Sequence, residues 1–228
     1  MMLEPWDKLP EYMRNEKVKP YYVSLSRKKN SLALKRIFDV VMSVVLFILL
    51  LPIIAAISIW IKLDSKGPVF FRQVRITAYG RKFRIYKFRT MVENAEALGS
   101  QVTSQNDMRV TRVGEKIRRL RLDELPQLIN IFKGEMSFVG TRPEVPRYVK
   151  QYSPEMYATL LLPAGVTSEA SIEYKDEDEL LRDASNADEI YIKEVIPGKM
   201  IWNLKEIREF SFFKEIKILF RTVGAVLK

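Results

Sequence analysis

The most prominent hydrophobic feature of the chain is an apolar run at residues 40–61, which contains no charged side chain. About 20 apolar residues in a helix are enough to cross the hydrocarbon core of a bilayer. The run begins too late and is too long for a typical secretory signal peptide, and it lacks a clear small-residue cleavage site. The pattern therefore predicts a helix that enters the membrane and remains part of the protein.

Two features leave open how this helix sits in the membrane. Pro52 lies near the middle of the run, where a residue without an N–H favours a sharp kink. Lys/Arg-rich flanks favour the cytoplasmic side, and here both flanks are basic. They contain Arg27, Lys28, Lys29, Lys35 and Arg36 before the run and Lys62, Lys66, Arg72 and Arg75 after it. A kinked, re-entrant helix that returns to the same leaflet satisfies both flanks, but a straight helix with a tolerated proline is the alternative.

Beyond this run the pattern is mixed and predicts a helix-rich α+β fold. Apolar and aromatic segments at residues 69–71 and 83–88 predict strands around a turn at 79–80. Helical spacing predicts helices at 90–98, 110–122, 125–132 and, with an acidic surface, 176–188. An amphipathic helix is predicted at 206–228, either docked on the domain, which is the commoner use, or lying on a membrane.

This reading divides the chain into three parts. Residues 1–31 form a polar extension that is expected on the protein surface or at the membrane interface. Residues 32–62 form the membrane helix, and residues 63–228 form a small domain on the cytoplasmic side.

Composition narrows the chemistry available to that domain. The chain contains neither cysteine nor histidine. Disulfides, a thiolate nucleophile, a histidine base and the usual zinc ligands are therefore excluded. Catalysis would have to use carboxylates, Lys, Tyr, Ser or Thr, and a metal ion would be a hard one bound by oxygen atoms.

The net charge of +10 is unevenly distributed along the chain. Residues 62–150 hold 19 Lys and Arg against 9 Asp and Glu, whereas residues 151–200 hold 4 against 11. A basic segment next to a membrane helix indicates anionic lipid or phosphate as a partner. Nucleic acid is the competing partner for a basic protein, but no nucleic-acid-binding motif is visible, so none is expected to bind.

The densest charged cluster lies at the start of a predicted helix. Three arginines within residues 118–121 precede two adjacent carboxylates, Asp123 and Glu124. Pro126 is tolerated in a first helical turn, so a helix is expected to begin close to Asp123 and to present free N–H groups that suit phosphate and magnesium. A carboxylate can also act as a nucleophile. A purely structural interpretation stays open, because Asp and Glu commonly cap helices.

Five segments of the sequence carry a resemblance to a known family. They are KRIFD at 35–39, KGPVFFRQ at 66–73, IYKFRTM at 85–91, LDELPQL at 122–128 and GEMSFVGTRP at 134–143. Each is weak evidence alone, but together, in this order and at about this spacing, they resemble the bacterial sugar transferase family. These are monotopic phosphoglycosyl transferases that begin capsule, O-antigen and glycoprotein glycan assembly. The resemblance runs from about Leu34 to the end of the chain.

The resemblance assigns roles to particular residues. Family members have a re-entrant helix broken at a proline, which matches Pro52. The family's Asp-Glu pair falls on Asp123, which would be the nucleophile that takes the phospho-sugar, and on Glu124, which would help to hold Mg²⁺ and assist proton transfer. Pro143 would shape the nucleotide loop. Basic positions expected to face the diphosphate are Arg75, Lys87, Arg89 and Arg142.

The reaction that this resemblance implies is transfer of a sugar 1-phosphate from a UDP-sugar to undecaprenyl or another polyprenyl phosphate, with release of UMP. It would take place at the cytoplasmic face of the bacterial inner membrane, in contact with membrane lipids. The sugar, the glycan pathway and the oligomeric state stay open. The alternative is a non-catalytic, membrane-anchored basic scaffold that binds anionic lipid and a partner, and such a scaffold would release no UMP.

The sequence differs from the family pattern at several positions. Leu51 precedes the proline of the membrane helix where some relatives have Ser, Thr77 stands where Gly is common, and Thr141 replaces the first proline of Pro-Arg-Pro. Residues 164–167 read Ala-Gly-Val-Thr where Pro-Gly-Ile-Thr is usual. These differences are expected to affect sugar and nucleotide preference more than the reaction.

Overall fold

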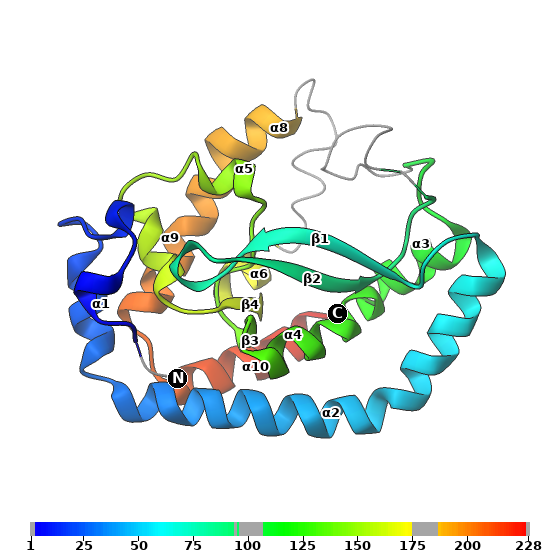
Figure 1. Ribbon diagram of the computed structural model, residues 1–228, viewed down its shortest axis with the longest axis horizontal. Helices are drawn as coiled ribbons and strands as arrows, with labels where there is room; N and C mark the ends of the chain where they lie inside the picture. The colour runs from blue at the N-terminus through cyan, green and yellow to red at the C-terminus, as the bar shows by residue number, and fades with distance from the viewer. Residues whose placement is uncertain (1–2, 94, 96–106, 175–186, 227–228) are drawn as a thin grey trace.

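The computed structural model describes residues 3–93, 95, 107–174 and 187–226. It confirms a helix-rich α+β fold, in which helices surround two small two-stranded sheets (Figure 1). The strands are β1 (Phe70–Ile76), β2 (Lys82–Phe88), β3 (Met136–Val139) and β4 (Ala164–Thr167). The α-helices are α1 (Lys19–Ser26), α2 (Lys29–Asp64), α3 (Arg112–Arg119), α4 (Leu128–Lys133), α5 (Pro146–Val149), α6 (Glu169–Glu173), α8 (Ala187–Ile190), α9 (Ile196–Arg208) and α10 (Phe212–Val226). The 3-10 helices are η1 (Trp6–Lys8), η2 (Glu11–Met13), η3 (Ala78–Gly80), η5 (Leu122–Gln127) and η6 (Met156–Leu161), and a π-helical turn, η7 (Tyr191–Val195), joins α8 to α9.

The apolar run lies within α2, a 36-residue helix that is long and apolar enough to cross a membrane. In its first half, the side that packs on the domain is polar, with Lys35 and Asp39 both buried. Lys35 Nζ forms an ion pair with Glu215 of α10 at 2.7 Å, and Asp39 Oδ1 accepts a hydrogen bond from the Phe138 N–H of β3 at 3.2 Å. The helix thus turns polar groups towards the protein, as helices in contact with lipid do.

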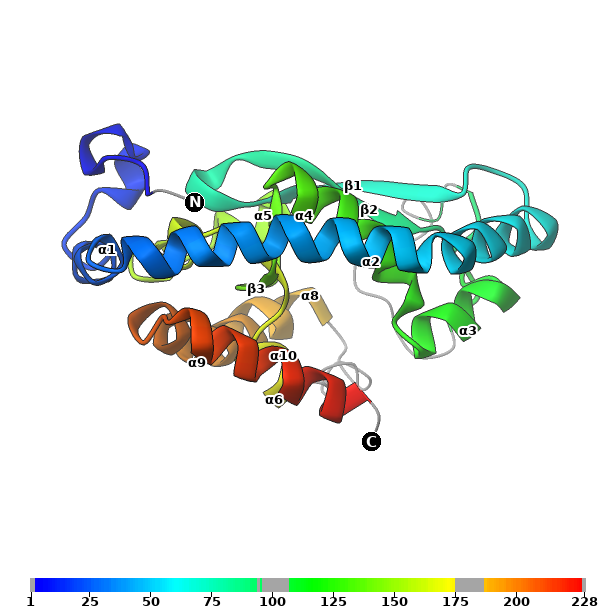
Figure 2. The same ribbon diagram turned by 90° about the horizontal axis from the view of Figure 1, so that it is seen from below.

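Exposed apolar side chains cover the outer side of α2 and continue onto α10. On α2 they are Leu34, Ile37, Val41, Val44, Val45, Ile48, Leu49, Leu51, Ile53, Ile59, Trp60 and Leu63, and on α10 they are Phe213, Phe220 and Val223. The two helices lie on the same side of the molecule (Figure 2), where the rings of Phe38 and Phe212 are 5.8 Å apart. An exposed apolar surface of this extent indicates contact with a membrane or another molecule, because such a surface is unfavourable in water.

Pro52 lies inside α2, which continues as one helix through it. Figure 1 shows α2 running along one edge of the molecule and then turning upward in its second half. There Ile54, Ile57 and Ile61 pack with Phe88 of β2 and Ile117 of α3. The bend therefore lets the end of the helix cover the elements that lead to the charged cluster at residues 118–124.

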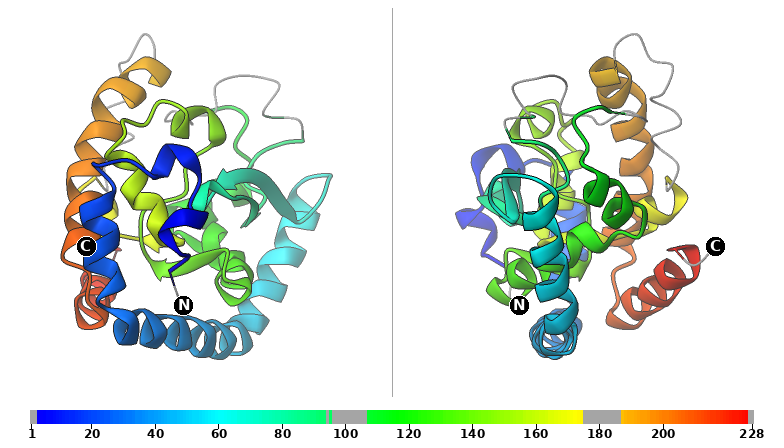
Figure 3. Two further views of the ribbon diagram at one scale, coloured as in Figure 1. Left: turned by 60° about the vertical axis from the view of Figure 1, so that its left-hand side comes forward. Right: turned by 90° about the vertical axis from the view of Figure 1, so that its right-hand side faces the viewer.

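The N-terminal segment contributes to the main hydrophobic core instead of lying loosely on the surface. Met13, Val18 and Leu25 are fully buried, in one cluster with Leu161 of η6 and Ile196 of α9. Helix α1 lies against α9 (Figure 3). The apolar residues of this segment are few and irregularly spaced, so no period in the sequence marked them as core residues.

The predicted elements are confirmed in part. Strands β1 and β2 form the expected antiparallel hairpin, and α4 ends at Gly134, whose φ of 79° suits glycine at a helix C-terminus. No helix begins at residue 90, because Met91 forms an antiparallel bridge with Val110. Residues 94 and 96–98 of that predicted helix lie outside the described residues. Most of the acidic segment predicted at 176–188 also lies outside them. The helix predicted at 206–228 is two helices, of which α10 docks on the domain through Ile218 and leaves other apolar side chains exposed.

Candidate active site

The two adjacent carboxylates lie in a tight turn between α3 and α4. Arg121 adopts a left-handed conformation, with φ 56°, which is uncommon for a residue with a side chain. The chain then enters η5, whose first turn contains Asp123 and Glu124. The sequence predicted that an α-helix begins here, but α4 begins only at Leu128. The carboxylates are therefore presented by a short 3-10 turn and not by the N-terminus of a longer α-helix.

Glu124 is the centre of an ion-pair cluster that joins three elements. Its Oε1 accepts hydrogen bonds from Lys87 Nζ of β2 at 2.8 Å and from Arg142 Nη2, on the loop after β3, at 2.6 Å. Its Oε2 has a longer contact of 3.4 Å with Arg142 Nη1. Burial opposes ionisation of Glu124, but Arg142 and Lys87 outweigh it and hold the pKa of Glu124 well below its ordinary value of 4.5. Glu124 is therefore ionised at neutral pH, and Oε2 is the oxygen best placed to accept another ligand.

Asp123 is in a different electrostatic state. It is 8% exposed, and its carboxylate has no hydrogen-bond partner among the described residues. Burial raises the pKa of Asp123 above 3.8, and the charge of Glu124 adds to this shift, while Lys87 and Arg142 oppose it. A carboxylate that is poorly solvated and not held by hydrogen bonds keeps its lone pairs available, which suits a nucleophile.

A buried asparagine, which the sequence analysis missed, fixes the register between β2 and the turn. Asn130 of α4 is fully buried. Its Oδ1 accepts from the Tyr86 N–H at 2.9 Å, and its Nδ2 donates to Arg84 O at 3.1 Å and to Glu135 Oε2 at 2.7 Å. These bonds tie the helix that follows Glu124 to the strand that carries Lys87. The only signal in the sequence is a polar residue on the apolar side of a helix.

Two glycines position the loop that carries Arg142. The Gly165 N–H, near the start of β4, donates to Thr141 O, just after the end of β3, at 2.9 Å. A Cβ added to Gly165 would lie 2.2 Å from the backbone of Gly140. This close approach of two backbones is possible only without side chains, and it aims the residues after Gly140 at the carboxylate pair.

Arg75, which was predicted to face the diphosphate, contacts Pro143, which was predicted to shape the nucleotide loop. Arg75 Nη1 on β1 donates to Pro143 O at 3.0 Å and lies 4.0 Å from Glu144 Oε2. Its Nε donates to Gln73 Oε1 at 2.9 Å. Arg75 therefore braces the loop that carries Arg142, and Pro143 supplies the carbonyl for that brace.

The structure does not bring Arg89 to the cluster. The side chain of Arg89 is almost fully buried, and its guanidinium donates to the carbonyls of Ser65 at 2.9 Å and Pro68 at 2.7 Å, and also to that of Lys66. These groups form the loop after α2. The phosphate contact predicted for Arg89 has no support in this geometry, which indicates a structural role. Pro52 likewise belongs to α2 and not to the cluster.

Arg89→Ala is expected to reduce stability by roughly 2–4 kcal/mol, because the substitution removes charged hydrogen bonds to buried carbonyls. The free energy of unfolding from denaturant titration would measure this loss. Arg89→Lys is the matched control and should lose less, since it keeps the charge and one donor. A stable Arg89→Ala protein that has lost its activity would instead restore the phosphate-binding role.

The carboxylate pair has the chemistry of a magnesium site only if a ligand supplies further oxygen atoms. No group of three or more acidic side chains that could hold a metal occurs in the described part of the chain. Mg²⁺, however, usually binds proteins through one or two carboxylates and takes its other ligands from water and substrate phosphates. Glu124 Oε2 could provide one such oxygen ligand, with the Asp123 carboxylate nearby.

Gln127 is a second residue that the sequence analysis missed. It is 1% exposed, and neither Oε1 nor Nε2 has a hydrogen-bond partner in the region that the structure describes. A buried amide without partners costs about 1–3 kcal/mol. Gln127 lies four residues after Asp123, within the same turn. Locally unfavourable groups of this kind are expected at functional sites.

Comparisons with known proteins place these residues in a family context. The family described as Bacterial sugar transferase matches residues 30–228. A UDP-N-acetylgalactosamine-undecaprenyl-phosphate N-acetylgalactosaminephosphotransferase of Aeromonas hydrophila is 38% identical over 198 residues, which are 85% of this chain and 44% of that protein. UDP-glucose:undecaprenyl-phosphate glucose-1-phosphate transferases of Escherichia coli strain K12 and Caulobacter vibrioides are 36% and 35% identical, over 93% and 85% of this chain and 44% and 69% of their own lengths. The chain thus spans less than half of the Aeromonas and Escherichia proteins.

Proposed function

Because the chain belongs to the bacterial sugar transferase family, we propose that it transfers a sugar 1-phosphate from a UDP-sugar to undecaprenyl or another polyprenyl phosphate and releases UMP. The observation that carries this proposal is the ion-pair cluster in which Glu124 binds Lys87 and Arg142 beside the buried, unbonded carboxylate of Asp123. The relatives named above act on UDP-sugars and undecaprenyl phosphate, which supports the choice of donor and acceptor.

In the proposed reaction, Asp123 attacks the phosphorus that carries the sugar. A bond forms between Asp123 Oδ and phosphorus, and the bond from phosphorus to the UMP oxygen breaks, which gives UMP and an aspartyl phospho-sugar. An oxygen of the polyprenyl phosphate then attacks the same phosphorus. This step forms the polyprenyl-diphosphate-sugar and restores the Asp123 carboxylate. Donor and acceptor therefore need not occupy the site together.

The neighbouring charges fit this sequence of steps. Lys87 and Arg142 place positive charge where the diphosphate gathers negative charge. The Arg142 side chain is 38% exposed, so it can reach a ligand while Lys87, at 20%, stays with Glu124. Burial lowers the pKa of Lys87 and Glu124 opposes that shift, which helps Lys87 to keep its proton. Magnesium held by Glu124 Oε2, with Asp123 nearby, would neutralise further charge on the diphosphate.

The exposed apolar surface of α2 and α10 supports a site at a membrane face. A polyprenyl phosphate keeps its phosphate at the membrane surface, so only a site near that surface reaches both substrates. The polar inner side of α2, its bend and its two basic flanks fit a re-entrant helix that leaves the domain on the cytoplasmic face of the inner membrane. On this arrangement the protein is monotopic.

This topology predicts the labelling of two single cysteines. The chain has no native cysteine, so Ser31→Cys and Ser65→Cys, near the two ends of α2, each introduce one thiol. Both should be protected from an impermeant thiol reagent in intact cells and should react after lysis. Labelling of only one of them in intact cells would show that α2 crosses the membrane.

The function itself is tested by UMP release. The purified chain, given undecaprenyl phosphate and Mg²⁺, should release UMP from at least one member of a panel of UDP-sugars. A folded protein that releases UMP from none of them would favour the membrane-anchored scaffold, in which the carboxylate pair has only a structural role.

A further inference from the structure

The backbone that follows Arg142 is hydrogen-bonded to strand β1. Pro143 O accepts from Arg75 Nη1 and Glu144 O accepts from the Ile76 N–H, both at 3.0 Å. These two bonds tie the loop after β3 to one element only. A second anchor, on another element, would be needed to fix the direction in which the loop presents Arg142.

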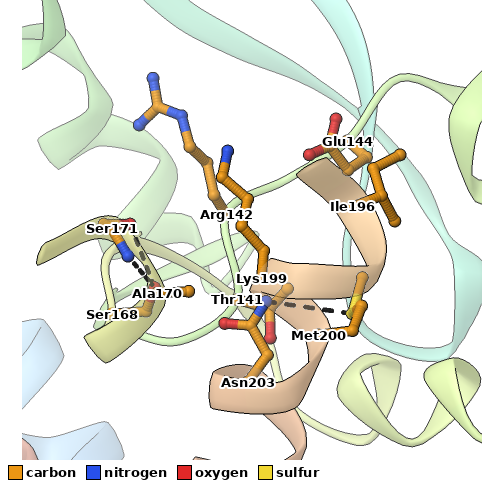
Figure 4. Close-up of a pocket in the computed structure, with 10 residues that line it drawn as sticks. All are labelled: Thr141, Arg142, Glu144, Ser168, Ala170, Ser171, Ile196, Lys199, Met200 and Asn203. Carbon is orange, nitrogen blue, oxygen red and sulfur yellow. Dashed lines mark hydrogen bonds between the residues drawn. The ribbon is translucent and has the colours of Figure 1, made fainter. Parts of the chain in front are cut away.

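The side chain of Glu144 supplies that second anchor. Glu144 is buried, and its Oε1 accepts a hydrogen bond from the Tyr191 hydroxyl at 2.7 Å, while its Oε2 lies 4.0 Å from Arg75 Nη1. In Figure 4 the Arg142 and Glu144 side chains leave the loop in different directions, and Glu144 lies towards Ile196 at the start of α9. The loop is therefore joined to a residue that comes 47 positions later in the chain.

Tyr191 is itself buried, and two neighbours hold its ring. The ring centroids of Tyr148 and Tyr191 are 4.9 Å apart, and Lys199 Nζ lies 5.4 Å from the centroid of the Tyr191 ring. Contacts of both kinds favour a defined ring position. Tyr191 is also the first residue of η7, and single π-helical turns are frequent at functional sites. The hydroxyl is thus presented to Glu144 from a fixed place.

We propose that Tyr191 is a positioning residue for the transfer reaction. Its hydroxyl holds Glu144, and Glu144 keeps the loop where Arg142 Nη2 reaches Glu124 Oε1, at 2.6 Å. The inference rests on the proposed function, in which Arg142 stabilises charge on the diphosphate. Tyr191 touches no substrate atom and acts through Arg142 alone. A small displacement of a group that binds the reacting phosphate slows the reaction even when the protein stays folded.

Tyr191→Phe is expected to lower kcat/KM for the UDP-sugar by about tenfold, because the ring stays in place and only the bond to Glu144 is lost. UMP release by the purified full chain is the measurement. Tyr148→Phe is the matched control, since Tyr148 is also buried and its hydroxyl donates to a different carboxylate, that of Asp188, at 2.5 Å. Both variants should lower the melting temperature by a few degrees, but Tyr148→Phe should keep wild-type turnover.

A double-mutant cycle measures whether Tyr191 acts through Arg142. Arg142→Ala alone should lower kcat/KM by at least about tenfold. Adding Tyr191→Phe to Arg142→Ala should then change kcat/KM by less than about twofold, because no guanidinium remains to be positioned. A purely structural role of Tyr191 would instead multiply the two losses.

Three results would overturn the assignment: wild-type turnover in Tyr191→Phe, an equal loss of turnover in Tyr148→Phe, or two losses that multiply in the cycle. In each case UMP release by the wild-type chain leaves the proposed function standing. A wild-type chain that releases UMP from no UDP-sugar would contradict the function itself, and this inference with it.

Discussion

Asp123→Asn is expected to reduce UMP release by at least about a thousandfold, which corresponds to roughly 4 kcal/mol of transition-state stabilisation. The amide has almost the shape of the carboxylate, but it is not a nucleophile for phosphorus. The chain contains no Cys or His that could replace it. Release of UMP by the purified variant, under conditions in which wild type turns over, is the measurement.

The same substitution should leave the protein at least as stable as wild type at neutral pH. The pKa of Asp123 is raised by burial, so its charged form is less favourable in the folded state than in the unfolded state. Wild type therefore loses stability relative to Asp123→Asn as the pH rises from 3.8 through the folded pKa. Loss of activity together with a lower melting temperature would point to misfolding and not to a missing nucleophile.

Asp188→Asn is a matched control for this comparison. Asp188 accepts a hydrogen bond from Tyr148, and that bond holds the pKa of Asp188 below 3.8. The carboxylate is therefore favourable in the folded state, and its loss should lower stability slightly. Turnover should be retained, because Asp188 lies on α8, apart from the Glu124 cluster.

Glu124→Gln is expected to reduce both turnover and stability. Lys87 and Arg142 share Glu124 Oε1 at 2.8 Å and 2.6 Å, and a neutral amide leaves two cations facing each other. Breaking a buried ion pair on one side costs about 3 kcal/mol or more, although water screens the partly exposed Arg142. Turnover should fall by roughly a hundredfold or more, because the proton transfer and the metal binding proposed for Glu124 both use the charge.

The pH dependence of stability separates this charge effect from a packing effect. The pKa of Glu124 is well below 4.5 in the folded protein, so its stabilising contribution is fully present above 4.5 and is lost as the pH falls towards the folded pKa. The stability difference between wild type and Glu124→Gln should therefore be constant at neutral pH and shrink in acid. Adding Lys87→Met to Glu124→Gln should recover part of the lost stability. A difference that persists unchanged in acid would assign the loss to packing.

The sequence singled out the carboxylate pair and the two basic residues that contact Glu124, because all four lie within short, recognisable segments. It expected the basic residues to face the diphosphate and did not predict their ion pairs with Glu124. Asp123 and Glu124 are adjacent, and Lys87 and Arg142 each stand within a segment typical of the family. The ion pairs themselves depend on how β2 and the loop after β3 meet the turn, and no local pattern encodes that distance.

Arg89 shows the opposite case. Its segment predicted a phosphate contact, but a guanidinium can satisfy backbone carbonyls as well as phosphate oxygens, and only the fold decides between them. The buried amides of Asn130 and Gln127 were not predicted for the same reason, since whether an amide is bonded or unpaired is a property of its neighbours in space.

The hydrophobicity of residues 40–61 predicted the long helix, and the polar residues at its start also indicate which face packs on the protein. Lys35 and Asp39 precede the apolar run and are spaced four residues apart, so they share one face of a helix. The structure buries that face against β3 and α10 and leaves the apolar residues outside. The N-terminal segment could not be placed in the same way, because its buried residues follow no helical or strand period.

The most direct test of the account is the mass of the protein after incubation with a UDP-sugar from which it releases UMP, in the absence of a polyprenyl phosphate. The covalent mechanism predicts one added sugar phosphate, located on the peptide that contains Asp123, absent from the Asp123→Asn variant and removed when undecaprenyl phosphate is added. Steady-state kinetics should then give parallel double-reciprocal lines. Intersecting lines with no adduct on that peptide would show direct transfer between the two substrates and would contradict the role of Asp123 as the nucleophile.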